Sequence, residues 1–133
     1  MEYNLQPGMT AEKSEQVTDN NTAIKYGSGG VAVYATPAMI GLMEGTCLAA
    51  VDPHLPEGMA TVGTQLEVKH LAATPVGMTV KATATLTAVA GKKLTFTMEA
   101  FDDKEKIGEG THQRYIIDLA KFLQKAAEKQ DAK

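Results

Sequence analysis

Three polar side chains, Glu44, His70 and Thr36, lie in sequence settings where acid–base chemistry is possible. Glu44 interrupts the apolar segment 38–51, whose hydrophobic residues cover every side of a helical wheel and so predict a helix enclosed by protein. An ionised carboxylate is costly in such a place unless it is paired, hydrogen-bonded or kept protonated. Active sites contain such groups, but so do structural sites in which a helix N-terminus or an arginine holds the carboxylate. The placement of Glu44 alone leaves both interpretations open.

His70 and Thr36 each have an ordinary structural explanation when they are taken one at a time. His70 ends a strand-like segment whose alternation places it with Val62, Leu66 and Val68 on the face that we expect to be buried. A histidine at the end of such a face is more often structural than catalytic. Thr36 precedes a proline that suits the first position of a helix, so Thr36 has the chemistry of a helix N-cap.

The remaining reactive residues do not form a metal or cysteine site. Cys47 is the one cysteine of the chain and lies in the apolar segment, so we expect neither an intrachain disulfide nor a cysteine-based metal site. A buried thiol without cationic neighbours is usually inert. His54 and His112 have no metal-ligand partner at a useful spacing. The glycine-rich segment 27–30 lacks the Lys-Ser/Thr of a phosphate-binding loop, and there is no Gly-x-Ser-x-Gly elbow.

The elements that must position these groups follow in the order strand, helix and then a run of strands. We expect a strand within residues 12–18, a turn-rich loop over 20–30, the central helix up to about Asp52, and a final helix from Asp118. The strand candidates after the central helix are residues 60–70, 78–89, 94–98 and 107–117.

One apolar helix followed by an antiparallel meander predicts an α+β fold in which the sheet wraps around the helix. We expect one domain over residues 1–133, with a tail from about 126 that frays. Short connections predict that strands adjacent in sequence after residue 58 pair antiparallel. Such a sheet leaves an edge strand exposed, and edge-to-edge dimerisation is a common way to cover it.

Composition and charge narrow the classes of function. The chain has 133 residues, 44% of them hydrophobic and 22% charged, which is ordinary for a soluble globular protein. A net charge of −3 without any basic run argues against a nucleic-acid surface. No apolar run reaches transmembrane length, and the N-terminus lacks the regions of a signal peptide. We therefore expect a cytoplasmic protein with no nucleic-acid or membrane partner.

Thr36, Glu44 and His70 taken together resemble the hotdog-fold thioesterases, in particular the fluoroacetyl-CoA thioesterase-like family. The segments that carry the resemblance are residues 35–44, 62–77 and 108–114, and the likeness extends from about residue 5 to residue 122. This resemblance implies a hotdog fold, in which a curved antiparallel sheet wraps around a long central helix. It also implies a homodimer in which the two sheets become continuous, and higher assemblies stay open.

The resemblance also implies a role for each of the three residues. Glu44 would act as nucleophile or general base on the thioester carbonyl, and the sequence does not choose between these. Thr36 would hydrogen-bond and position Glu44 or the attacking species. His70 would protonate the departing thiolate of coenzyme A or activate water.

Three further residues are expected to contact the substrate. Backbone N–H groups near Gly63 and Thr64 are candidate donors to the thioester oxyanion, because glycine permits close approach. Arg114 would pair either with a phosphate of coenzyme A or with an internal carboxylate.

The sequence therefore predicts an acyl-CoA thioesterase that hydrolyses a small or medium acyl thioester to the free acid and coenzyme A, without metal or other cofactor. The members of the family that select the fluorinated substrate resemble one another in a bulky aromatic residue before the catalytic threonine. Residues 27–33 contain no aromatic, so the acyl group is left open. The alternatives are a non-catalytic acyl-CoA-binding module and an acyl-thioester hydratase or dehydratase, which typically places an Asp and a His on or beside the helix.

Overall fold

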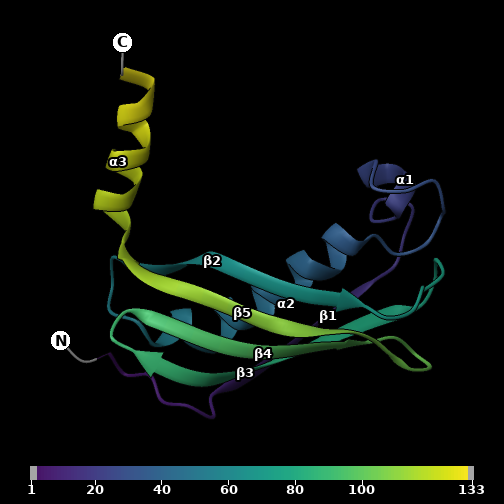
Figure 1. The fold of residues 1–133 in the computed structure, drawn as a ribbon, viewed down its shortest axis with the longest axis horizontal. Coiled ribbons are helices and arrows are strands. Elements are labelled where there is room, and N and C mark those ends of the chain that lie inside the picture. The colour runs from purple at the N-terminus through teal and green to yellow at the C-terminus, as the bar shows by residue number, and fades with distance from the viewer. Residues whose placement is uncertain (1–2, 132–133) are drawn as a thin grey trace.

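The computed structural model describes residues 3–131 of the chain. The elements in chain order are β1 (Thr10–Gln16), α1 (Ala23–Tyr26), α2 (Thr36–Val51), the 3-10 helix η1 (Asp52–His54), β2 (Met59–His70), β3 (Thr79–Ala90), β4 (Lys93–Phe101), β5 (Lys106–Asp118) and α3 (Leu119–Asp131). The strands form one antiparallel sheet in the order β1-β3-β4-β5-β2, which curves past α2 (Figure 1). The predicted α+β architecture, a sheet wrapped around one long helix, is confirmed.

The pairing of sequence neighbours is confirmed for β3 with β4 and for β4 with β5, but it is wrong for β2 with β3. β2 pairs with β5 at one edge of the sheet, while β3 lies between β1 and β4. Both sides of β3 are therefore occupied, and the connection over residues 71–78 carries the chain across to it. β1 and β2 are the two edge strands.

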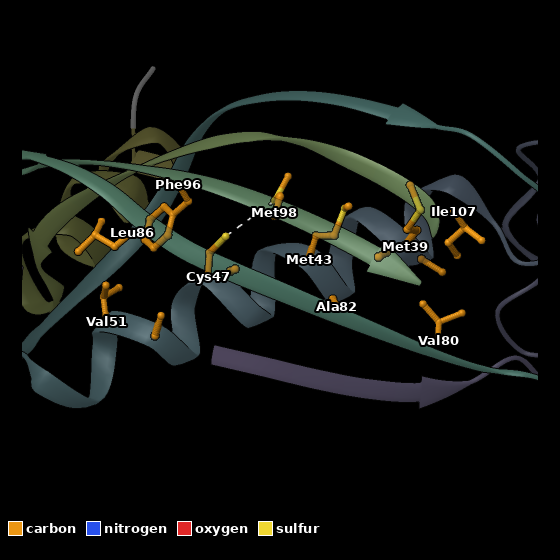
Figure 2. Packing of buried hydrophobic residues seen from close by; sticks show 14 of the residues in the cluster. Met39, Met43, Cys47, Val51, Val80, Ala82, Leu86, Phe96, Met98 and Ile107 are labelled. Carbon is orange, nitrogen blue, oxygen red and sulfur yellow. Dashed lines mark hydrogen bonds between the residues drawn. The ribbon is translucent and has the colours of Figure 1, made fainter. Parts of the chain in front are cut away.

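The core lies between α2 and the concave face of the sheet (Figure 2). Along α2 the buried face recurs every four residues through Met39, Met43, Cys47 and Val51, which is the spacing of one helical side. These side chains pack against residues of the sheet that are buried in turn: Val80, Ala82, Leu86, Phe96, Met98 and Ile107. Each large side chain buried here contributes about 1.5–3 kcal/mol of transfer free energy.

The opposite side of α2 is not covered by this chain. Pro37, Gly41 and Leu48 are exposed, Leu48 to 39% of its surface, and the Glu44 side chain on the same stripe is 36% exposed. The prediction of a helix enclosed by protein is therefore wrong for a single chain, because the sheet covers one side of α2 and nothing in residues 3–131 covers the other. An apolar surface beside a carboxylate is left open.

A β-bulge in β2 changes which residues share a face. The register of β2 against β5 shifts between Gly63 and Gln65, so that Thr64 has no partner. Leu66 lies opposite the buried His112, whereas Val62 lies opposite the exposed Tyr115. Directly paired residues point to the same side of a sheet. The predicted common face of His70 with Leu66 and Val68 fits this register, but including Val62 was wrong. The expectation that this face is buried is also wrong for Leu66, which is 43% exposed.

Helix α3 begins where predicted, with the Asp118 carboxylate accepting a hydrogen bond from the Lys121 N–H at 3.1 Å. It projects from the end of β5 away from the sheet (Figure 1), and its apolar residues Leu119, Phe122 and Leu123 are each more than two-fifths exposed. The helix runs to Asp131, further than the predicted fraying from residue 126, and residues 132–133 lie outside the described part. No helix within that part is both long and apolar enough to cross a membrane.

Candidate functional site

Thr36 and His70 are joined by a hydrogen bond at the start of α2. The Thr36 hydroxyl lies 2.7 Å from Nδ1 of His70. The N-cap position of α2 belongs to Ala35, whose backbone is extended at φ −76° and ψ 139° and whose carbonyl accepts from Met39 N–H at 3.0 Å. The prediction of Thr36 as the N-cap is thus wrong by one residue. Because the Thr36 hydroxyl has no capping role, it is available to orient His70.

His70 presents its second ring nitrogen without a partner. Nε2 of His70 is buried and makes no hydrogen bond to any residue between 3 and 131. Burial lowers the pKa of His70 below its ordinary value of 6.5, because desolvation disfavours the charged imidazolium. A neutral imidazole held by Thr36 at one nitrogen, with the other unused, is equipped to exchange a proton with a ligand.

A cavity of about 420 Å³ opens beside this pair. Its wall is formed mainly by small and apolar side chains from two segments, one before α2 and one after β2: Ala23, Ser28, Val31, Val33, Tyr34, Leu71, Ala72 and Ala73. The Tyr34 hydroxyl donates to the Glu15 carboxylate, and burial raises the pKa of Tyr34, so its phenol stays protonated. A largely apolar wall with a polar Thr–His pair suits a ligand with an acyl end.

Glu44 lies in a second cavity, of about 240 Å³, at the bulge of β2. A Cβ built on Gly63 would lie only 2.9 Å from Oε2 of Glu44 and 3.0 Å from Cε1 of His112, so glycine is the residue that permits this approach. Thr64, next to it, has no partner in the ladder, and its hydroxyl donates to the Gln113 carbonyl at 3.1 Å. Glu44, Gly63 and Thr64 are therefore brought together. Their predicted roles at a thioester carbonyl stay predictions.

His112 and Arg114 are buried side chains on β5 that lie beside Glu44. Oε2 of Glu44 lies 3.8 Å from Nε2 of His112, and Nη1 of Arg114 lies 3.1 Å from the same nitrogen. Arg114 is only 5% exposed and gives its other donors to Thr61, from Nε to the hydroxyl at 2.7 Å and from Nη2 to the carbonyl at 2.9 Å. The Thr61 hydroxyl in turn donates to Asp52 at 2.6 Å. Arg114 is thus tied to the interior and reaches a carboxylate through Thr61.

The two groups of residues are separate within one chain. Thr36 and Glu44 are eight positions apart on α2, which corresponds to a rise of about 12 Å. The contacts of residues 3–131 include none between Glu44 and either Thr36 or His70. The structure therefore brings Thr36 to His70 and Glu44 to Gly63, but it does not gather all three predicted catalytic residues around one point.

Sequence reasoning missed His112, because it was considered only as a metal ligand. A signal was present in the alternation of β5, where His112, Arg114 and Ile116 occupy every second position and are all buried. A histidine and an arginine on the inner face of a strand need polar partners. That requirement points to Glu44 as one of them.

A curved antiparallel sheet wrapped around one long helix is the architecture of the hotdog-fold thioesterases. In this chain a carboxylate and a Thr–His pair lie on the open side of that helix. The family model described as fluoroacetyl-CoA-specific thioesterase (FlK) matches residues 17–120. The chain belongs to the fluoroacetyl-CoA thioesterase family.

Similar proteins point the same way. The fluoroacetyl-CoA thioesterase of Streptantibioticus cattleyicolor is 45% identical over 100 residues, which cover 75% of this chain and 72% of that protein. A solved structure of fluoroacetyl-CoA thioesterase FlK superimposes with a TM-score of 0.89 at 36% identity, covering 95% of this chain and 98% of that one. A variant of FlK in complex with acetyl-CoA also gives a TM-score of 0.89, at 35% identity and with 94% and 98% covered.

Proposed function

We propose that this protein hydrolyses acyl-CoA thioesters with a small or medium acyl group, releasing the free acid and coenzyme A. The observation that carries the proposal is the hydrogen bond between Thr36 and His70 beside an apolar cavity. A capping threonine would bond a backbone N–H, and a structural histidine would bond through both ring nitrogens. Here the two side chains hydrogen-bond each other, and Nε2 of His70 has no partner among the described residues. Family membership supports the same chemistry.

Glu44 is the group that we assign to the attack on the thioester carbonyl, either directly or through a water that it deprotonates. A carboxylate with 36% of its side chain exposed can contact a substrate directly, as a base or a nucleophile must. We assign stabilisation of the oxyanion to backbone N–H groups at Gly63 and Thr64, and the bulge that leaves Thr64 without a partner in the ladder supports this assignment.

His70 is the group that we assign to the proton delivered to the departing thiolate, with Thr36 fixing its ring. Its lowered pKa keeps the resting ring neutral, so Nε2 first takes up a proton from water and then passes that proton to the thiolate, which returns the ring to its neutral form. Of the two roles predicted for Arg114, we propose the internal one beside Glu44. Its burial keeps the guanidinium from the phosphates of coenzyme A.

We further propose that the active form is a homodimer in which Glu44 of one protomer meets Thr36 and His70 of the other. The distance along α2 separates these groups within a chain. The open stripe of α2, with Pro37, Gly41 and Leu48, and the unpaired edge of β2 are next to Glu44 and would be covered by a second copy. No cofactor other than the coenzyme A of the substrate has a role in this scheme, and a cytoplasmic location follows from the substrate.

Thiol release from a panel of acyl-CoA esters tests the proposed activity. The panel should include short, branched, aromatic, long and fluorinated acyl groups. We expect turnover of small or medium esters, with the preferred group assigning the cavity. Negligible release from every ester would overturn the proposal, and binding without release, seen by thermal shift, would favour an acyl-CoA-binding module instead.

A further inference from the structure

His112 lies between Glu44 and Arg114, and the roles proposed above leave it without one. Its side chain is fully buried, and its ring lies 6.2 Å from that of Phe96, centroid to centroid. A buried histidine that contacts the assigned attacking group is unexplained by packing alone, because an apolar residue would pack against Phe96 equally well.

Two contacts fix the hydrogen on the His112 ring. Nδ1 lies 2.8 Å from the Gln65 carbonyl oxygen, which can only accept, so Nδ1 carries the hydrogen. Nε2 lies 3.1 Å from Nη1 of Arg114, which can only donate, so Nε2 is an acceptor. His112 is therefore neutral. Burial is the largest effect on its pKa and lowers it. The Gln65 carbonyl opposes this lowering, the Arg114 guanidinium adds to it, and Glu44 opposes it by the smallest amount.

Arg114 is held in place from its other side. Asp52, at the end of α2, accepts from both the hydroxyl and the backbone N–H of Thr61, at 2.6 and 3.2 Å. Thr61 in turn accepts two hydrogen bonds from the guanidinium. The guanidinium is thereby directed at His112, and the ion pairs of residues 3–131 include none between Arg114 and Glu44.

We propose that His112 is a positioning residue that separates the Glu44 carboxylate from the Arg114 guanidinium and so preserves its reactivity. The proposal rests on the role assigned to Glu44 above. A carboxylate paired directly with an arginine is stabilised in its ionised form and is a weaker base and nucleophile. His112 accepts the Arg114 N–H instead, and the chain Asp52–Thr61–Arg114 holds that arrangement. The ionisable neighbours of His112 are Glu44 on α2 and Arg114 on β5.

Ring-nitrogen NMR of the full-length protein tests the geometry without any reference to activity. We expect His112 to be the neutral Nδ1–H tautomer at pH 7, because Nε2 accepts from Arg114 and burial lowers the pKa of the ring. An Nε2–H tautomer, or an imidazolium at pH 7, would overturn the proposal. The NMR result does not depend on whether the protein hydrolyses any ester. Failure of the proposed function is detected separately, as absent thiol release.

His112→Leu and His112→Gln test the separation itself. Leucine removes the acceptor and frees Arg114 to pair with Glu44, while the glutamine oxygen can still accept from Arg114. In His112→Leu we expect the titration midpoint of the ¹³C-labelled Glu44 carboxyl to move to lower pH and kcat to fall about tenfold or more, the scale of lost acid–base assistance. KM should change little, and His112→Gln should restore most of kcat.

His54→Leu, at an exposed histidine that ends the 3-10 helix η1, is the matched control and should behave as wild type. Equal loss in His112→Leu and His112→Gln, or an unmoved Glu44 titration in His112→Leu, would contradict the proposal. If His112→Leu does not fold, the tautomer of His112 in the unmutated protein still decides the proposal, because an Nε2–H tautomer could not accept from Arg114.

Discussion

Gly63 and Glu44 approach each other so closely that a methyl group on Gly63 would lie 2.9 Å from the Glu44 carboxylate oxygen. A real Cβ does not sit at such a distance, so one side of the contact has to move. Glu44 is the flexible partner. The Glu44 carboxylate can therefore take this position only because residue 63 of β2 is a glycine.

Gly63→Ala is expected to displace Glu44 and to lower kcat by about tenfold or more, because misplacing a reacting group by an ångström is costly. The free energy of unfolding should also fall, because the added Cβ would lie 3.0 Å from Cε1 of the buried His112 as well. Steady-state kinetics and urea unfolding measure the two effects. Gly30→Ala, where nothing lies within 4 Å of the added Cβ, is the control. Equal kcat in the two variants would show that the contact does not matter.

Glu44→Gln and His70→Ala are each expected to lower kcat by about two orders of magnitude, the scale of losing nucleophilic or acid–base assistance. Circular dichroism should show that both variants fold, because both side chains are only partly buried. Wild-type turnover in Glu44→Gln would sink the assignment of that residue, and an unfolded Glu44→Gln would favour a structural carboxylate.

Mixed dimers of Glu44→Gln and His70→Ala chains should regain activity that neither variant has alone. If Glu44 of one protomer works with His70 of the other, one of the two sites in a mixed dimer carries both mutations and the other carries neither. Co-expression with two different affinity tags isolates the mixed species, and thiol release measures it. We expect about half of the wild-type rate per dimer from one intact site of two. A mixed dimer that stays inactive would place both residues of each site on the same chain.

Leu48→Glu should disrupt the dimer by placing a charge on the open apolar stripe of α2, where Leu48 is 39% exposed. We expect a monomer with little activity, measured by light scattering and thiol release. Thr10→Glu, on the opposite edge strand β1, adds the same charge away from this stripe and should remain dimeric. A dimeric, active Leu48→Glu would show that α2 does not form the interface.

Stability should decrease as the pH falls below 6.5, the ordinary pKa of histidine, because His70 and His112 both have lowered pKa values in the folded state. Below 6.5 the unfolded chain takes up protons that the folded chain refuses, so the free energy of unfolding drops until the folded pKa values are reached. Urea unfolding between about pH 5 and 8 measures this slope around the histidine range. His112→Gln should flatten the slope and His54→Gln should not.

The core of the fold could be predicted because it follows from local spacing. Met39, Met43 and Cys47 recur at helical intervals, and the alternation from Thr79 to Ala90 is that of a strand. The pairing of β2 with β5 could not be predicted from the sequence. It depends on which edge of the sheet is free after β3 and β4 have paired. The bulge at Thr64 could not be predicted either, because a threonine fits a regular strand as well as a bulged one.

The candidate site divides in the same way. Glu44 stood out as a charge in an apolar segment, and the structure places it beside Gly63. Helix geometry alone predicts that Glu44 and Thr36 lie about 12 Å apart on α2. The family resemblance nevertheless assigns both residues to one site. His112 reaches the Gln65 carbonyl through pairing with β2, which lies more than forty residues earlier in the chain, and reaches Glu44 through the packing of α2 on the sheet.

Burial raises the pKa of the Cys47 thiol to about 12, and its sulfur lies 3.8 Å from that of Met98 in the centre of the molecule. A protein that releases a thiol as product thus keeps its own thiol unreactive toward disulfide exchange. A chromogenic disulfide reagent should therefore report coenzyme A as it forms without labelling the native enzyme. The same reagent in urea would count unfolded molecules, one sulfhydryl for each chain.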